Sequence, residues 1–164
     1  MGHSRLLFLM VTCLCIFTGC AGVARISDFP RTSETLDFDK LAKANYESKD
    51  AIWNQQTEYE YFIEVEKTEE DELYKAITDA LVNSGYKVSY SNKQNRVVIG
   101  KRGLRLNEWK SIIGVYYRGR EGFFQIFIKN AITQDITGGW RENRAKKVAV
   151  LLCSRLPKCK AMPE

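Results

Sequence analysis

The chain has 164 residues, a formal net charge of +5 and five cysteines, a size that suits one domain with a flanking segment. Its single histidine is His3, so the rest of the chain cannot form a Ser-His-Asp triad, a Cys-His pair, a histidine zinc site or a histidine pH sensor. A domain of this size buries enough surface to fold without a structural metal, and we expect no cofactor.

The first residues form an apolar segment with a charged start. Arg5 precedes an apolar run that ends at Phe17, and the small residues Thr18-Gly19-Cys20 follow. A short positive region, an apolar core and a small-residue exit are typical of a secretory signal peptide. We therefore expect residues 1–19 to direct export.

The stretch Phe17-Thr18-Gly19-Cys20 resembles the lipobox of the bacterial lipoprotein class. The resemblance implies that Cys20 becomes the new N-terminus and carries a diacylglyceryl thioether, commonly with a further N-acyl chain such as palmitate. Two or more acyl chains anchor a protein stably. Ala21 after the cysteine resembles the pattern that sorts lipoproteins to the outer membrane. The alternative is an uncleaved anchor, because the apolar segment extended to Ala24 is long enough to span a bilayer.

Residues 20–58 are polar and mixed, with no clean apolar stripe. We interpret them as a lipidated N-terminus and a tether, whose later part near Ile52 and Trp53 docks on the domain. A flexible coil of this length spans on the order of 35 Å. The folded domain is expected over residues 59–156, followed by a tail at 157–164.

The domain opens with a strand and a helix. Tyr59, Tyr61, Ile63 and Val65 alternate with glutamates, which predicts a strand with one buried face. A capping box at Thr68 and Asp71 then predicts the start of an amphipathic helix that Gly85 ends. The apolar face of this helix comprises Leu73, Ile77, Ala80 and Leu81.

Four strands and a second helix follow. Alternation predicts strands over 86–90, 96–101, 109–118 and 123–131, the last two forming a hairpin across 119–122. Gly114 in mid-strand suggests a bend or a close helix approach. Thr137 is the expected cap of the last helix, and Pro157 stops it. The apolar face of that helix is expected to hold Ala145, Val148, Ala149, Leu152 and Leu156.

This order of elements predicts an α+β fold with a single antiparallel sheet. The order is strand, helix, four strands, helix, and both helices on one face would bury each element's single apolar side. The topology is similar to TATA-binding-protein-like and BamC-like folds. That likeness concerns topology alone, and a fold does not carry a function.

Cys153 and Cys159 are an even pair near the end of an exported chain. Such pairs usually oxidise outside the cytosol, so we expect a disulfide that locks the last helical turn to the tail. A redox-active dithiol is the alternative, but the pair lacks CxxC spacing.

The charges are unevenly distributed along the chain. Residues 59–83 carry 8 acidic and 2 basic side chains, whereas residues 84–164 carry 17 basic and 5 acidic ones. Such a basic half is a candidate contact for an anionic surface, although an ordinary solvated surface would look the same in sequence. The candidate contacts are Lys101, Arg102, Arg105, Arg118, Arg120, Arg141, Arg144 and Lys147.

Three catalytic or binding motifs are weaker than their ordinary explanations. Gly100-Lys101-Arg102-Gly103 looks like the GxxG loop of KH domains, but a strand precedes it, so we expect a turn with glycines at positive φ and no nucleic-acid partner. Glu60, Glu64 and Glu66 could serve a glycosidase, yet a solvated strand face is routinely glutamate-rich. Gly138-Gly139 lacks the spacing of a phosphate-binding loop.

These observations favour a non-catalytic lipoprotein of the cell envelope, held at the outer membrane and facing the periplasm. Its domain would bind another envelope protein or an anionic lipid surface. The alternative is a small-ligand or lipid-binding module with a pocket between the sheet and the last helix. An envelope hydrolase that uses the strand carboxylates is a third hypothesis.

Overall fold

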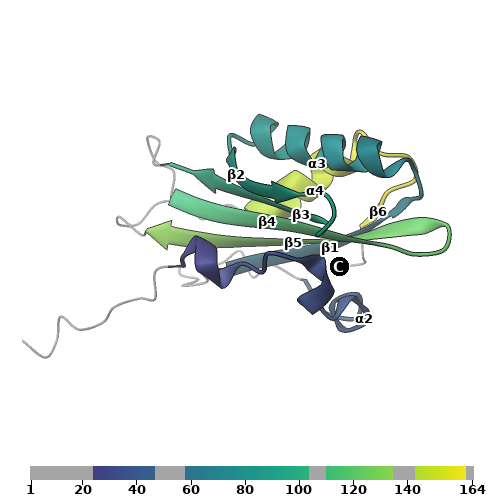
Figure 1. Ribbon diagram of the computed structural model, residues 1–164, viewed down its shortest axis with the longest axis horizontal. Coiled ribbons are helices and arrows are strands. Elements are labelled where there is room, and N and C mark those ends of the chain that lie inside the picture. The colour runs from purple at the N-terminus through teal and green to yellow at the C-terminus, as the bar shows by residue number, and fades with distance from the viewer. Residues whose placement is uncertain (1–23, 47–57, 104–109, 135–142, 162–164) are drawn as a thin grey trace, which may run out of the picture.

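A single antiparallel sheet forms the centre of the molecule (Figure 1). The structure is a computed structural model that describes residues 24–46, 58–103, 110–134 and 143–161. The strand order is β2-β3-β4-β5-β1-β6. The strands are β1 (Glu58–Glu66), β2 (Lys87–Asn92), β3 (Val97–Arg102), β4 (Lys110–Gly119), β5 (Phe123–Gln134) and β6 (Lys160–Ala161). The α+β class and the single antiparallel sheet are therefore confirmed.

Helices α3 (Glu70–Asn83) and α4 (Arg144–Cys153) cover one face of this sheet. The short elements η1 (Ile26–Asp28), η2 (Ser33–Thr35) and α2 (Phe38–Leu41) lie on the opposite face. The prediction of helices on one face alone thus holds only for α3 and α4. The predicted tail also differs, because β6 pairs with β1 at the edge of the sheet.

Helix α3 follows its predicted apolar stripe but begins differently. Its N-cap is Glu69, whose side chain makes no capping bond, while the Thr68 hydroxyl donates to the Glu72 carboxylate at 2.5 Å. Negative charge in the first turn suits the helix dipole without a capping box. Gly85 ends the helix with φ +81, as predicted. Four side chains of its inner face are completely buried, namely Leu73, Ile77, Ala80 and Leu81.

The β4–β5 hairpin is confirmed, with Gly119 opposite Phe124 in the register. The predicted turn around Gly100 is wrong, because Gly100 lies inside β3 and only Gly85 and Gly122 have positive φ among the described glycines. A Cβ at Gly100 would lie 3.0 Å from the Cβ of Tyr86. The lack of a side chain at Gly100 therefore permits Tyr86 to pack closely against β3.

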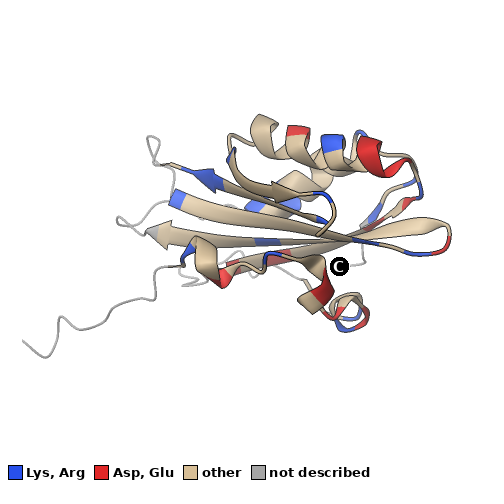
Figure 2. Cartoon of the chain, viewed as in Figure 1, with Lys and Arg blue, Asp and Glu red and all other residues tan. Residues whose placement is uncertain are grey.

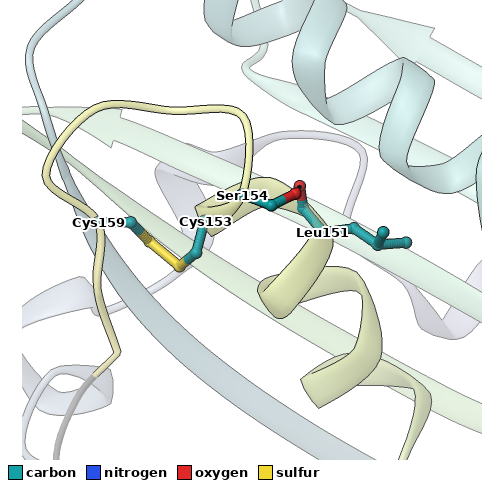
Figure 3. Close-up of a disulfide and its surroundings, with 4 residues drawn as sticks. All are labelled: Leu151, Cys153, Ser154 and Cys159. Carbon is teal, nitrogen blue, oxygen red and sulfur yellow. Dashed lines mark hydrogen bonds between the residues drawn. A yellow bond between two sulfur atoms is a disulfide. The ribbon is translucent and has the colours of Figure 1, made fainter.

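Helix α4 starts later than predicted. Asn143 is its N-cap and accepts the backbone N–H of Lys146 at 2.9 Å, whereas Thr137 lies outside the described residues. At its other end, the Cys153–Cys159 disulfide bridges Cα atoms 5.0 Å apart and ties the helix to the segment that enters β6 (Figure 3). In the same last turn, the Ser154 hydroxyl donates to the carbonyl of Leu151 at 2.8 Å.

The second face of the sheet is covered by residues 24–46, which we call the strap. Phe29 and Phe38 are each 1% exposed and pack on a core that includes Phe62, Tyr116 and Phe127. The sequence predicts a tether here. The structure instead shows an irregular cover without a helical repeat, in which these two phenylalanines are the large buried side chains. Ile52 and Trp53, the predicted docking residues, lie outside the described residues.

Polar contacts fix the middle of the strap. The Arg31 carbonyl accepts from the Asn95 side chain at 3.2 Å, and the Ser33 N–H donates to the Asn95 carbonyl at 2.9 Å. Gly114 leaves room for the strap, because a Cβ there would lie 2.9 Å from the ring of Phe29 and 2.7 Å from the Tyr116 hydroxyl. The close approach predicted at Gly114 therefore comes from the strap and a neighbouring tyrosine.

Candidate anionic-partner interface

The sheet has two ends that differ in charge. We call the end with the β4–β5 turn the hairpin end, and the opposite end, where β3 finishes and β4 begins, the loop end (Figure 1). The predicted contact residues divide between these ends. Arg118 and Arg120 lie at the hairpin end, and the described residues Lys101, Arg102, Arg144 and Lys147 lie toward the loop end. Arg105 and Arg141 lie outside the described residues.

At the hairpin end the arginines bind the strap. The Arg118 guanidinium donates to the Asp39 carboxylate at 2.7 Å, and Arg120 donates to the same oxygen. These two hydrogen bonds, Arg118 first, hold the pKa of Asp39 below its usual value. Arg118 also lies 5.0 Å from the centre of the Phe38 ring and donates to the Gln125 side chain. Their charge is used within the molecule, so this pair is a weaker candidate for an outside partner.

Two of the predicted contacts are part of the interior. Arg102 and Arg144 are each 7% exposed. The Arg102 guanidinium donates to the carbonyl of Ser84 at 2.8 Å, at the end of α3. Burial raises the pKa of the Tyr86 phenol, and the charges of Arg144 and Arg102 oppose that rise, which places both guanidiniums near this phenol. These two arginines are therefore part of the buried interior at the loop end and are not exposed to a partner.

A buried polar cluster accompanies them, which sequence reasoning missed. The Tyr86 and Ser111 hydroxyls lie 2.9 Å apart, and the Asn130 side-chain amide donates to Tyr86 at 3.0 Å. The same amide donates to the carbonyl of Ile112 at 3.0 Å. These residues come from three separate segments, so the pattern of any one segment contains no signal of the cluster.

The exposed cations of the loop end form the remaining candidate interface. Figure 2 shows Lys and Arg at the end of β3 and at the start of β4. Lys101 is exposed and lies directly opposite Lys87 in the register of β2 and β3. We call the exposed set the basic end: Arg25, Lys87, Lys101, Lys110, Lys146 and Lys147.

The strand carboxylates are engaged by neighbouring side chains. Glu64 accepts from Gln125 at 2.9 Å, and Glu66 forms an ion pair with Lys158 at 2.8 Å. Burial raises the pKa of Glu60, whose carboxylate lies 3.9 Å from the Lys129 ammonium. Within the described ranges, no group of three His, Cys, Asp or Glu side chains is arranged to hold a metal ion.

A shallow groove of about 1160 Å³ lies at the hairpin end, away from the basic end. Its charged residues are three basic and three acidic ones, so it has no strong preference for an anion. The space predicted for a ligand, between the sheet and α4, is filled by Ala145, Val148, Ala149 and Leu152, each at most 1% exposed. The lining of the groove is Lys67, Thr68, Glu69, Glu70, Arg96, Gly119, Arg120, Glu121 and Phe124.

Comparison with known proteins does not add a relative. No family model matches the sequence, and the search of curated proteins finds no significant match. No helix in the described part of the chain is both long and apolar enough to cross a membrane.

Proposed function

We propose that this protein is a non-catalytic, lipid-anchored protein of the cell envelope, whose basic end binds an anionic surface or partner. The observation that carries the proposal is the collection of exposed cations at one end of the sheet. Lys87, Lys101 and Lys110 are exposed and have no ion pair among the described residues. Clustered cations of one sign attract anionic partners and speed their association.

The facing lysines of β2 and β3 strengthen this argument. Like charges directly opposite each other on neighbouring strands destabilise a sheet, by up to about 1 kcal/mol relative to a favourable pair. An acidic residue opposite Lys87 would serve the fold better than Lys101 does. A stability cost at an exposed position fits a surface that is kept basic for binding.

The first residues of the chain support the proposed anchor and the proposed location. The lipobox-like stretch that ends at Cys20 supports acylation, export and attachment to the outer membrane, facing the periplasm. The Cys153–Cys159 disulfide suits an oxidising compartment. The likeness of topology to TATA-binding-protein-like and BamC-like folds stays part of the proposal and adds no function to it.

Two measurements test the proposal. The intact mass of protein extracted from membranes should include acyl chains at Cys20, and the Cys20→Ser variant should lack them. Crosslinking the native protein and then purifying it should recover an anionic lipid or protein. Recovery should fall when Lys87, Lys101 and Lys110 are all changed to Glu. An unmodified Cys20, or unchanged recovery with the triple variant, would overturn the proposal.

The matched control carries the same charge change elsewhere. Lys43, Lys67 and Lys75 are exposed and lie outside the basic end. Replacing all three by Glu lowers the net charge as much as the triple variant of the basic end does. Because the basic end stays intact, recovery should stay as in the wild type. An equal loss in both variants would mean that total charge matters and the basic end does not.

A further inference from the structure

The strap sets how far the domain can be from its anchor. Ala24, the first described residue, is four residues after Cys20. Four residues of fully extended chain reach at most about 14 Å. A lipid attached at Cys20 would therefore hold the domain directly beside the bilayer, since residues 24–46 of the expected tether are packed on the sheet.

The strap also determines which end of the domain faces the anchor. Ala24 and Ile26 pack against the strap-face core, and the strap starts at the loop end and runs toward the hairpin end (Figure 1). Asp39, later in the strap, is bound by Arg118 and Arg120 at the hairpin end. The anchored end of the strap and the basic end are consequently the same end of the molecule.

We infer that the partner of the basic end is the anionic phospholipid headgroups of the membrane that holds the anchor. This inference rests on the proposed function and deepens it. The domain lies with Lys87, Lys101 and Lys110 toward the headgroups, and its hairpin end projects away from the bilayer. The short anchor supplies proximity, and the lysines select one orientation among those that the anchor permits.

Electrostatics favours this orientation over its reverse. Strand β4 has ten residues and is about 33 Å long, which is several Debye lengths at physiological salt. The acidic first turn of α3, at the hairpin end, is therefore screened from an anionic leaflet that meets the loop end. Three exposed lysines near such a leaflet shift the ratio of docked to undocked domain by about 100-fold.

The test uses full-length protein, acylated at Cys20 and reconstituted into vesicles. Lysine acetylation read by mass spectrometry reports the accessibility of each ammonium. In vesicles containing phosphatidylglycerol, labelling of Lys87, Lys101 and Lys110 should fall severalfold relative to vesicles of phosphatidylcholine alone. Labelling of Lys67 and Lys75 should be the same in both. Added salt should restore the labelling of the first three lysines.

The other possible results overturn either the lipid inference alone or the proposed function as well. Equal labelling in the two kinds of vesicle, or protection in both, would overturn the inference of anionic headgroups. Protection of Lys67 in place of Lys101 would reverse the orientation and overturn it as well. If Cys20 carries acyl chains and the lysines stay accessible, while the triple Glu variant loses a crosslinked envelope protein, the proposed function stands and only the lipid inference fails. An unmodified Cys20 overturns both.

Discussion

The two faces of the sheet are covered in different ways. The helix face is covered by α3 and α4, whose buried side chains repeat at helical spacing. The Cys153–Cys159 disulfide ties the C-terminal end of α4. The strap face is covered by an irregular segment, in which Phe29 and Phe38 supply the large buried side chains. A cover with few apolar contacts opens locally at a lower free energy than one with many. The strap is therefore expected to be the less stable of the two covers.

The largest effect that separates the faces is expected from Phe38→Ala. Phe38 is 1% exposed, and its ring centre lies 6.3 Å from that of Phe62. Removing a buried phenylalanine costs about 3–5 kcal/mol. Amide hydrogen exchange should show loss of protection in residues 24–46, with α3 and α4 still protected.

The matched variant on the other face is Leu152→Ala, at a fully buried position of α4. It should cost about 2–5 kcal/mol in urea unfolding and lower protection over the whole sheet. Val150→Ala, at a 60% exposed position of the same helix, should change stability by less than about 0.5 kcal/mol. If Phe38→Ala also exposed α3 and α4 to exchange, the two covers would form one cooperative unit and the comparison would fail.

Gly114→Ala tests the fit between the strap and the sheet. A Cβ at this position would lie 2.7 Å from the Tyr116 hydroxyl and 2.9 Å from the Phe29 ring, so one of them must move. Overpacking of this kind costs about 1–3 kcal/mol. The control is Gly103→Ala, where a Cβ would have no neighbour within 4 Å. Equal melting temperatures for the two variants would contradict the packing of Phe29 on β4.

Removing the disulfide should loosen α4 and β6 before it affects the strap. The bridge closes a short loop with a sequence separation of 6, for which the chain-entropy model gives about 2 kcal/mol. The Cys153→Ala, Cys159→Ala double variant should lose about this much stability, and its exchange should increase in α4 and β6 before the strap. In the wild type, thiol labelling after denaturation without reductant should miss both cysteines. Labelling of either one would contradict the bridge.

The elements that the sequence predicts well are those with a period. The β4–β5 hairpin and the buried stripes of α3 and α4 follow from alternation and helical spacing, which need only neighbouring residues. The strap has no period, so its own sequence gives no such signal. A sequence signal for the second cover lies in the strands: Ser111–Tyr117 contain no charged residue, and Phe62 interrupts the polar positions between Glu60 and Glu64. In the structure Ser111–Tyr117 are all buried. Strands buried on both faces require a second cover.

From the sequence, the candidate site could be predicted only as a surplus of positive charge in residues 84–164. Asp39, which binds Arg118, is 79 residues away in the sequence, so the internal use of that arginine depends on the tertiary fold. Alternation could not distinguish the buried Arg102 from the exposed Lys101, because both faces of β3 are buried up to Gly100. The opposition of Lys87 and Lys101 depends on strand register, and a bulge between Val88 and Tyr90 hides it from simple counting.

The smallest expected effect is the response of the strap to acid. Hydrogen bonds from Arg118 and Arg120 lower the pKa of Asp39 in the folded protein below the usual value of an aspartate. A carboxyl with a lowered folded pKa contributes stability above its unfolded pKa and loses it as the pH falls through the folded value. Exchange rates corrected for intrinsic pH dependence should therefore rise in residues 24–46, relative to α3, as the pH drops below about 4. Because Asp39 is exposed, solvent screening keeps the change small.

The Asp39→Asn variant tests this assignment, because it should weaken the contact with Arg118 and Arg120 at neutral pH. Its strap should then show no further loosening in acid. An acid response equal to that of the wild type would assign the effect to other carboxyl groups.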